Sequence, residues 1–147
     1  VVGWGYARHM DSPEPYPGQG MRGPVVFITN PYAGSDGDII TAAAQNLGLG
    51  PVVGERSWGG VIGIDGRFEL VDGTSVTQPR YAFAFHKHGF GVENHGTDPD
   101  IEVPLGPSDW ENGEDLQLDV AVDEALARLE EKPAMTPPEL PPAAFLG

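Results

Sequence analysis

The chain has 147 residues, which suffices for one domain with its own hydrophobic core, and 22 acidic against 8 basic side chains give it a formal net charge of −14. This negative field repels phosphate backbones and anionic lipid headgroups, so we expect no nucleic acid and no membrane partner. An acidic composition of this kind is typical of a surface adapted to solubility or to salt, and the alternative is that it attracts basic peptides. The absence of cysteine excludes disulfides and thiolate chemistry, and it favours a reducing compartment, the cytoplasm.

The N-terminal part of the chain combines turn-forming and apolar segments. It begins with valine rather than methionine, so we expect a processed product or part of a longer chain. Residues 1–22 are predicted to be an irregular lead-in, because prolines and glycines crowd residues 11–24. The β-branched run at 25–29 predicts a central strand that is buried on both faces.

A strand–turn–helix unit is predicted next. The turn cluster at 30–38 precedes a helix that starts near 36–39 and ends at Leu47 before Gly48. Residues 51–54 then form a short strand. Because a crossover helix joins the two strands, they are predicted to pair in parallel.

The second half of the chain predicts antiparallel strands and a terminal helix. Residues 61–64 and 67–70 flank Asp-Gly, which is a hairpin signature, and a further strand within 75–85 is expected to be interrupted at Pro79. Residues 86–100 read as a long polar loop. Apolar residues at helical spacing predict a helix over 114–131, followed by a proline-rich extended tail at 132–147. The catalytic subdomain is thus expected at 23–131.

Ser35 lies between the predicted strand and helix, where a tight turn exposes a hydroxyl beside outward-pointing amides. Gly34 and Gly37 leave room for a substrate backbone, and the Asp36 N–H can donate to a tetrahedral oxyanion. This placement suits an acyl-transfer nucleophile. The alternative is a helix N-cap serine in a glycine turn.

Four blocks of the sequence resemble the C-terminal catalytic domain of tricorn-type serine peptidases, whose wider relatives are the C-terminal processing proteases. The resemblance covers residues 22–131. The blocks are residues 30–38, residues 47–50, residues 54–61, and residues 92–96 with 99–103. The resemblance implies a Clp protease/crotonase-like α/β sandwich, peptide substrates, homo-oligomeric assembly and no metal or organic cofactor.

The resemblance also implies roles for individual residues. Ser35 corresponds to the nucleophile, the amide of Asp36 to an oxyanion donor, and Glu93 to the carboxylate behind the base. A carboxylate in that place fixes the tautomer of the histidine and stabilises its imidazolium form. Trp58, followed by Gly59 and Gly60, is expected either to form a tight turn or to line the substrate cleft.

The family's general base is a histidine preceded by a serine, far upstream of the nucleophile. Residues 1–147 contain no such pair, so we expect the base from outside this chain and no activity from the chain alone. Its own histidines at 9, 86, 88 and 95 are predicted to be surface residues. A metal site formed by the last three is the alternative.

Two other readings of the fold stay open. One is a non-catalytic ligand- or peptide-binding module, and the other is an acyl-CoA enzyme of the crotonase type, which the acidic composition disfavours. An acidic residue that selects basic substrate side chains cannot be assigned by motif. Asp11 and Glu14 are the candidates.

Overall fold

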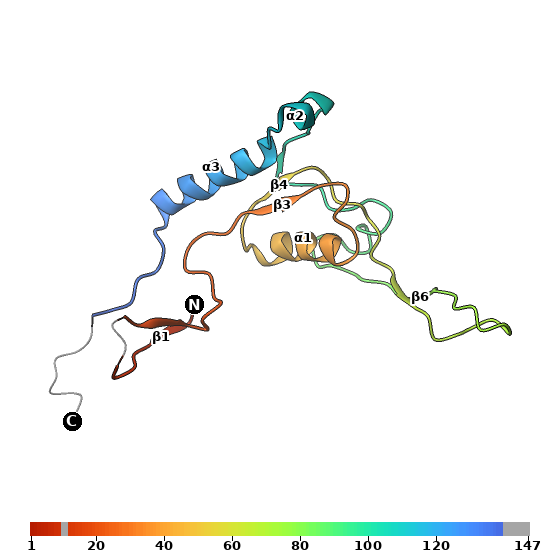
Figure 1. Cartoon of the computed structure of the whole chain (residues 1–147), viewed down its shortest axis with the longest axis horizontal. Coiled ribbons are helices and arrows are strands. Elements are labelled where there is room, and N and C mark those ends of the chain that lie inside the picture. The colour runs from red at the N-terminus through yellow and green to blue at the C-terminus, as the bar shows by residue number, and fades with distance from the viewer. Residues whose placement is uncertain (10–11, 140–147) are drawn as a thin grey trace. The chain divides into compact units, whose positions relative to one another are not determined.

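The structure is a computed structural model that describes residues 1–9 and 12–139 (Figure 1). Asp11, a candidate for substrate selection, falls outside the described residues. The chain divides into two compact units. One consists of Val25–Glu124, and the other combines Val1–Pro24 with Ala125–Gly147. No helix among the described residues is long and apolar enough to cross a membrane.

A parallel sheet forms the centre of the larger unit. Its strand order is β3 (Phe27–Thr29), β4 (Val52–Gly54) and β7 (Ile101–Glu102), and both pairs are parallel. The predicted strand–helix–strand unit with parallel pairing is therefore confirmed. The prediction of a central strand at 25–29 is wrong. Within the described residues β3 is paired only with β4, and its Ile28 is 47% exposed.

Helix α1 (Asp36–Leu47) connects β3 to β4 and agrees with the predicted helix. Ala42 and Ala44 are fully buried, and such small side chains allow a helix to approach a sheet closely. Gly48 adopts a left-handed conformation with φ 61°, and its N–H bonds back to carbonyls of the last turn. A core cluster of Ala42, Val61 and Val92 forms beneath this helix.

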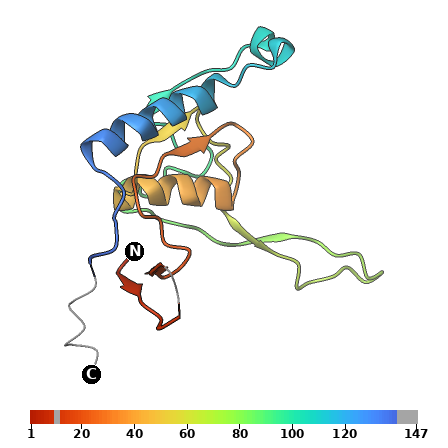
Figure 2. The same cartoon turned by 60° about the vertical axis from the view of Figure 1, so that its left-hand side comes forward.

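An antiparallel ribbon lies between β4 and β7 in the chain, and its register differs from the predicted hairpin. Strand β5 (Gly63–Asp65) pairs with β6 (Gln78–Tyr81) and not with residues 67–70. The chain reverses later, where the Leu70 N–H donates to the Thr74 carbonyl oxygen over 2.9 Å. Pro79 lies within β6 opposite Ile64, and the register of the pair shifts beside it, between Gly63 and Ile64. The strand therefore continues through Pro79, and the predicted interruption is a local irregularity in the pairing. Figures 1 and 2 show the ribbon projecting away from α1.

Asp65 forms ion pairs within this ribbon. The Asp65 carboxylate contacts Arg67 Nε at 2.8 Å and Arg80 Nε at 3.2 Å. It also accepts a hydrogen bond from the Arg67 N–H. Asp65 thereby joins the two legs of the ribbon instead of occupying its tip.

Two helices precede the C-terminal tail. Helix α2 (Pro107–Asn112) is a short element that the sequence did not predict, whereas α3 (Leu116–Glu131) confirms the predicted terminal helix. In α2, the Asp109 carboxylate accepts a hydrogen bond from the Gly106 N–H over 2.6 Å, and this bond closes the first turn.

The smaller unit contains a two-stranded ribbon where an irregular segment was predicted. Strand β1 (Gly3–Gly5) pairs antiparallel with β2 (Glu14–Tyr16). Pro15, opposite Trp4, is compatible with this ribbon because an isolated pair leaves one edge of each strand free of ladder bonds. The described part of the tail, residues 132–139, contains no helix or strand, and its Met135 N–H donates to the Arg22 carbonyl oxygen over 2.8 Å.

Candidate active site

Ser35 is the N-cap residue of α1, directly after the turn that follows β3. Its backbone has φ 54° and ψ −110°, a region that residues with a Cβ rarely occupy. Its side chain is exposed and makes no capping hydrogen bond. The capping interpretation is therefore correct for the position of Ser35 in the helix but not for its hydroxyl, which remains available for other chemistry.

The amides beside Ser35 belong to the first turn of α1. Asp36 is the first helical residue, and the first amides of a helix have no partner within the helix. The Gly37 N–H instead donates to the Gly34 carbonyl oxygen over 2.9 Å, which tightens the turn around Ser35. Positive charge from the helix dipole is concentrated at this end.

The loop that carries Trp58 packs against the Ser35 turn. The Trp58 N–H donates to the Ala33 carbonyl oxygen over 3.1 Å. The indole ring lies against two glycines: a Cβ on Gly34 would come within 2.6 Å of Trp58 Cε3, and a Cβ on Gly60 would also meet the ring. The ring is nevertheless 67% exposed, so it forms part of the surface next to Ser35.

Asp38 anchors this loop and was not singled out in the sequence. It is completely buried. Its Oδ1 accepts hydrogen bonds from Ser57 Oγ at 2.5 Å and from the Gly59 N–H at 2.8 Å, and its Oδ2 accepts one from the Gly60 N–H at 3.0 Å. In the sequence it appears only as an acidic residue in the first turn of a helix.

Glu93 is held by the next two amides of the same loop. Its Oε2 accepts hydrogen bonds from the Val61 N–H at 2.7 Å and from the Ile62 N–H at 2.9 Å. Four consecutive amides, residues 59–62, therefore donate to two carboxylates, the first pair to Asp38 and the second to Glu93.

The Glu93 segment also packs tightly on the Trp58 loop. The Asn94 N–H donates to the Gly59 carbonyl oxygen over 2.8 Å, and the Thr97 N–H donates to Ser57 Oγ over 2.8 Å. Gly59 has φ 91°, and a Cβ there would lie 2.5 Å from the Gly96 nitrogen. Because the neighbouring atoms are backbone, only glycine fits at position 59.

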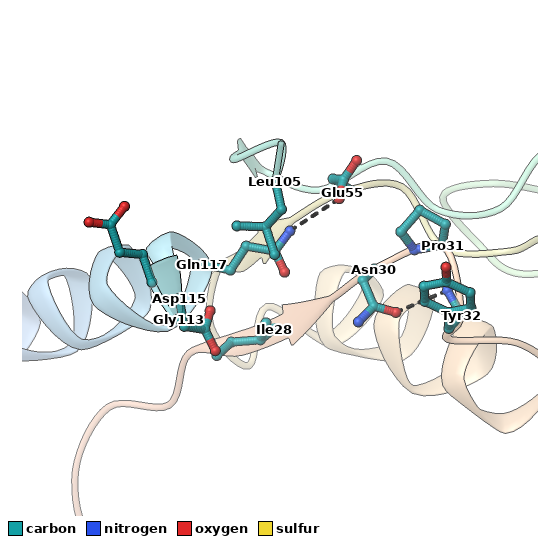
Figure 3. Close-up of a pocket in the computed structure, with 10 residues that line it drawn as sticks. Ile28, Asn30, Pro31, Tyr32, Glu55, Leu105, Gly113, Asp115 and Gln117 are labelled. Carbon is teal, nitrogen blue, oxygen red and sulfur yellow. Dashed lines mark hydrogen bonds between the residues drawn. The ribbon is translucent and has the colours of Figure 1, made fainter. Parts of the chain in front are cut away.

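A pocket of about 570 Å³ opens beside the turn that precedes Ser35, although Ser35 does not line it. Figure 3 shows it between β3, the start of α3 and the segment after β4, with the Gln117 amide directed at the Glu55 carboxylate. Its lining is acidic and apolar, and it consists of Ile28, Asn30, Pro31, Tyr32, Glu55, Leu105, Gly113, Glu114, Asp115 and Gln117. The sequence did not indicate this pocket.

The histidines of the chain do not assemble into a metal centre. No group of three or more metal-ligating side chains gathers among the described residues, which contradicts the alternative interpretation of His86, His88 and His95. His95 instead pairs through Nε2 with Asp98 Oδ2 at 2.9 Å on the surface.

Comparison with known proteins gives the same assignment as the sequence blocks. Residues 5–103 match the profile of peptidase family S41. Tricorn protease homolog 1 of Streptomyces coelicolor is 60% identical over 141 residues, which cover 96% of this chain and 13% of that protein. The tricorn protease of Thermoplasma acidophilum is 50% identical over 115 residues, covering 78% of this chain and 11% of that protein.

A solved structure agrees with these sequence matches. A crystal structure of the tricorn protease superposes with a TM-score of 0.77 at 48% identity, over 88% of this chain and 12% of that chain. This chain therefore spans only 11–13% of the length of these relatives. The expected mixed α/β fold and the resemblance to tricorn-type proteins are both confirmed. Since the family profile covers most of its length, the chain belongs to peptidase family S41, with tricorn proteases as close relatives.

Proposed function

We propose that this chain carries the nucleophile of a tricorn-like serine peptidase, which cleaves peptide bonds through an acyl-enzyme on Ser35. The observation that carries the proposal is the backbone of Ser35. A residue with a Cβ is held at φ 54°, while its exposed hydroxyl makes no capping bond. Strain of this kind persists only when the surroundings enforce it, and it is typical of catalytic turns.

The oxyanion of the tetrahedral intermediate would form beside the N-terminus of α1. The Asp36 amide is the donor nearest in sequence to Ser35, and the helix dipole favours negative charge at this end. Gly34 and Gly37 carry no side chains that would block an approaching peptide. The exposed ring of Trp58, with Gly59 and Gly60 behind it, would form one wall of the substrate cleft.

Glu93 would orient the histidine that acts as general base. Two amides occupy Oε2 of Glu93, and among the described residues no hydrogen bond is formed by Oε1. Oε1 is thus available to accept an imidazole N–H. One imidazole between Ser35 Oγ and the Glu93 carboxylate requires a separation of roughly 6–10 Å.

We propose that this histidine comes from a Ser-His pair upstream of the 147 residues. In the reaction, the imidazole takes the Ser35 hydroxyl proton as Oγ attacks the peptide carbonyl carbon. The same proton passes to the leaving amine when the C–N bond breaks. Water then hydrolyses the acyl-enzyme by the reverse sequence of proton transfers. No step needs a metal or an organic cofactor.

The biological setting that we propose is a cytoplasmic homo-oligomer acting on peptides. This follows the implied family properties and the acidic, cysteine-free composition. Residues 23–131 would be the catalytic subdomain between the lead-in at 1–22 and the tail at 132–147. Glu14 remains a candidate for substrate selection, and it lies on β2 with its side chain exposed.

A chimera tests the proposal. This chain replaces the matching segment of the Streptomyces coelicolor homologue, and peptide turnover and fluorophosphonate labelling are measured. We expect both in the chimera and neither in its Ser35→Ala variant, with turnover lower by about 10⁶-fold. The chain alone should resemble the Ser35→Ala variant. Turnover by the chain alone that disappears when one of its own four histidines is replaced would show that the base is internal.

The same labelling separates the alternative function, a non-catalytic ligand- or peptide-binding module. The pocket of about 570 Å³ favours that alternative, because Ser35 does not line it. An unactivated serine does not react with a fluorophosphonate. A folded chimera that remains unlabelled would therefore support the binding function.

A further inference from the structure

Asp38 is a fully buried carboxylate to which neither the family match nor the proposed mechanism assigns a role. It lies in the first turn of α1, three residues after Ser35. Its two oxygens accept three hydrogen bonds, all from the segment Ser57–Gly60. Burial of a carboxylate is unfavourable unless donors surround it, so these three bonds define the place of the loop relative to the helix.

The bonds of Asp38 connect the Trp58 loop to the nucleophile turn. The loop touches that turn at two further points, the hydrogen bond from Trp58 N–H to the Ala33 carbonyl and the contact of the indole with Gly34. Gly34 directly precedes Ser35 in the chain, and Asp38 follows it by three residues. Ser35 is therefore enclosed between two residues that both contact the same loop.

We propose that Asp38 is a positioning residue, which holds the Trp58 loop against the turn and thereby maintains the strained backbone of Ser35. The inference rests on the proposed function of Ser35. A carboxylate is required because all three partners donate hydrogen bonds. In an asparagine, one of the two oxygens is replaced by an NH₂ group, which would face either the Gly60 N–H or the Gly59 N–H and Ser57 hydroxyl, depending on the orientation of the side chain.

The first test does not depend on catalysis. Trp58 becomes the only tryptophan in the variant Trp4→Phe/Trp110→Phe, and acrylamide quenching then reports its exposure. Asp38→Asn should release the ring from Gly34. The quenching constant should rise by up to roughly 1.5-fold, the ratio of full exposure to the 67% observed. Amide exchange at Gly59 should accelerate in the same variant.

Asp100→Asn is the matched control. The Asp100 carboxylate also accepts a backbone bond, from the Val52 N–H over 2.8 Å, but none from the Trp58 loop. The Asp100→Asn variant should leave the acrylamide quenching of Trp58 unchanged. If Asp38→Asn does not fold, Ser57→Ala provides the test, because it removes one donor to the carboxylate, together with the acceptor of the Thr97 N–H, and keeps both amide bonds to Asp38. A smaller rise in quenching is expected, and an unchanged value would overturn the proposal.

The second test measures the chimera with peptide substrate. Asp38→Asn should lower kcat roughly 10- to 100-fold, because the nucleophile is displaced, and should also raise KM, because the released Trp58 loop forms one wall of the proposed substrate cleft. The pH dependence of kcat should keep its midpoints while the plateau falls. A folded Asp38→Asn chimera with wild-type kcat would overturn the positioning role.

Failure of the inference differs from failure of the proposed function. If Ser35→Ala keeps full turnover, the nucleophile assignment is wrong, and quenching still decides whether Asp38 holds the loop on the turn. If Ser35→Ala is inactive while Asp38→Asn is fully active, the nucleophile assignment stands and the role of Asp38 is wrong.

Discussion

Replacing Ser35 with glycine and with alanine separates a strained nucleophile from a capping serine. Glycine tolerates φ 54° and ψ −110°, so Ser35→Gly removes strain of about 1–3 kcal/mol. The added freedom of the unfolded chain offsets about 0.5–1 kcal/mol of this gain. We therefore expect Ser35→Gly to stabilise the fold by about 1 kcal/mol while it abolishes labelling of the chimera.

Alanine behaves differently because it keeps the Cβ. Since the Ser35 hydroxyl forms no capping bond, Ser35→Ala removes no structural interaction and retains the strain. Its free energy of unfolding should stay within about 0.5 kcal/mol of the wild-type value. A capping serine instead predicts that both variants lose stability, by about 1 kcal/mol for alanine and only a few tenths for glycine.

Urea denaturation followed by circular dichroism measures these differences. The comparison is valid if the denaturant slopes of the three proteins agree, since a changed slope indicates a change in the folded or unfolded ensemble. Destabilisation of Ser35→Ala by about 1 kcal/mol or more, with Ser35→Gly no more stable than the wild type, would refute the reasoning. The hydroxyl would then be a helix cap.

Three further predictions concern the surrounding loops. Glu93→Gln should preserve the fold and lower kcat of the chimera by about 10²–10⁴-fold, and an unchanged kcat would exclude an orienting role. Gly59→Ala should destabilise by several kcal/mol more than Gly48→Ala, which shares a positive φ but meets no atom within 4 Å; equal losses in urea unfolding would contradict the crowding argument. Hydrogen bonds from the amide of Thr74 and, secondly, from its hydroxyl hold the pKa of Asp72 below its ordinary value of 3.8. The contribution of Asp72 to stability is therefore present above pH 3.8 and is lost as the pH falls through the lowered pKa. An NMR titration midpoint at or above 3.8 would contradict this prediction.

Local patterns in the sequence were sufficient to predict those elements whose structure is determined by neighbouring residues. Helix α1 has its stop at Gly48 and its small buried residues in one segment, so its bounds could be predicted. The register of the ribbon, in which β5 pairs with β6, could not be predicted from local patterns. Asp65 pairs with Arg80, fifteen positions away, and no local pattern in the Asp-Gly segment indicates that contact.

The site shows the same division. The place of Ser35 between strand and helix could be predicted from local patterns, whereas its assignment as nucleophile rests on the resemblance. The hydrogen bonds of Asp38 could not be predicted, because its three donors come from residues 57, 59 and 60 and no local pattern links them to the helix. The role of Glu93 was predicted only through the resemblance, since a glutamate in a polar loop has no distinguishing pattern of its own.

The run of four amides at residues 59–62 limits how this chain can change in length. Its bonds to Asp38 and Glu93 use main-chain N–H groups, so the number of residues in the run sets the spacing between two carboxylates. One residue inserted in the run would change which N–H groups face Asp38 and which face Glu93, and it would displace the residues after the run by one position. We therefore expect insertions to be tolerated at the tip of the ribbon near Gly73, where open space surrounds the chain, and rejected within 59–62.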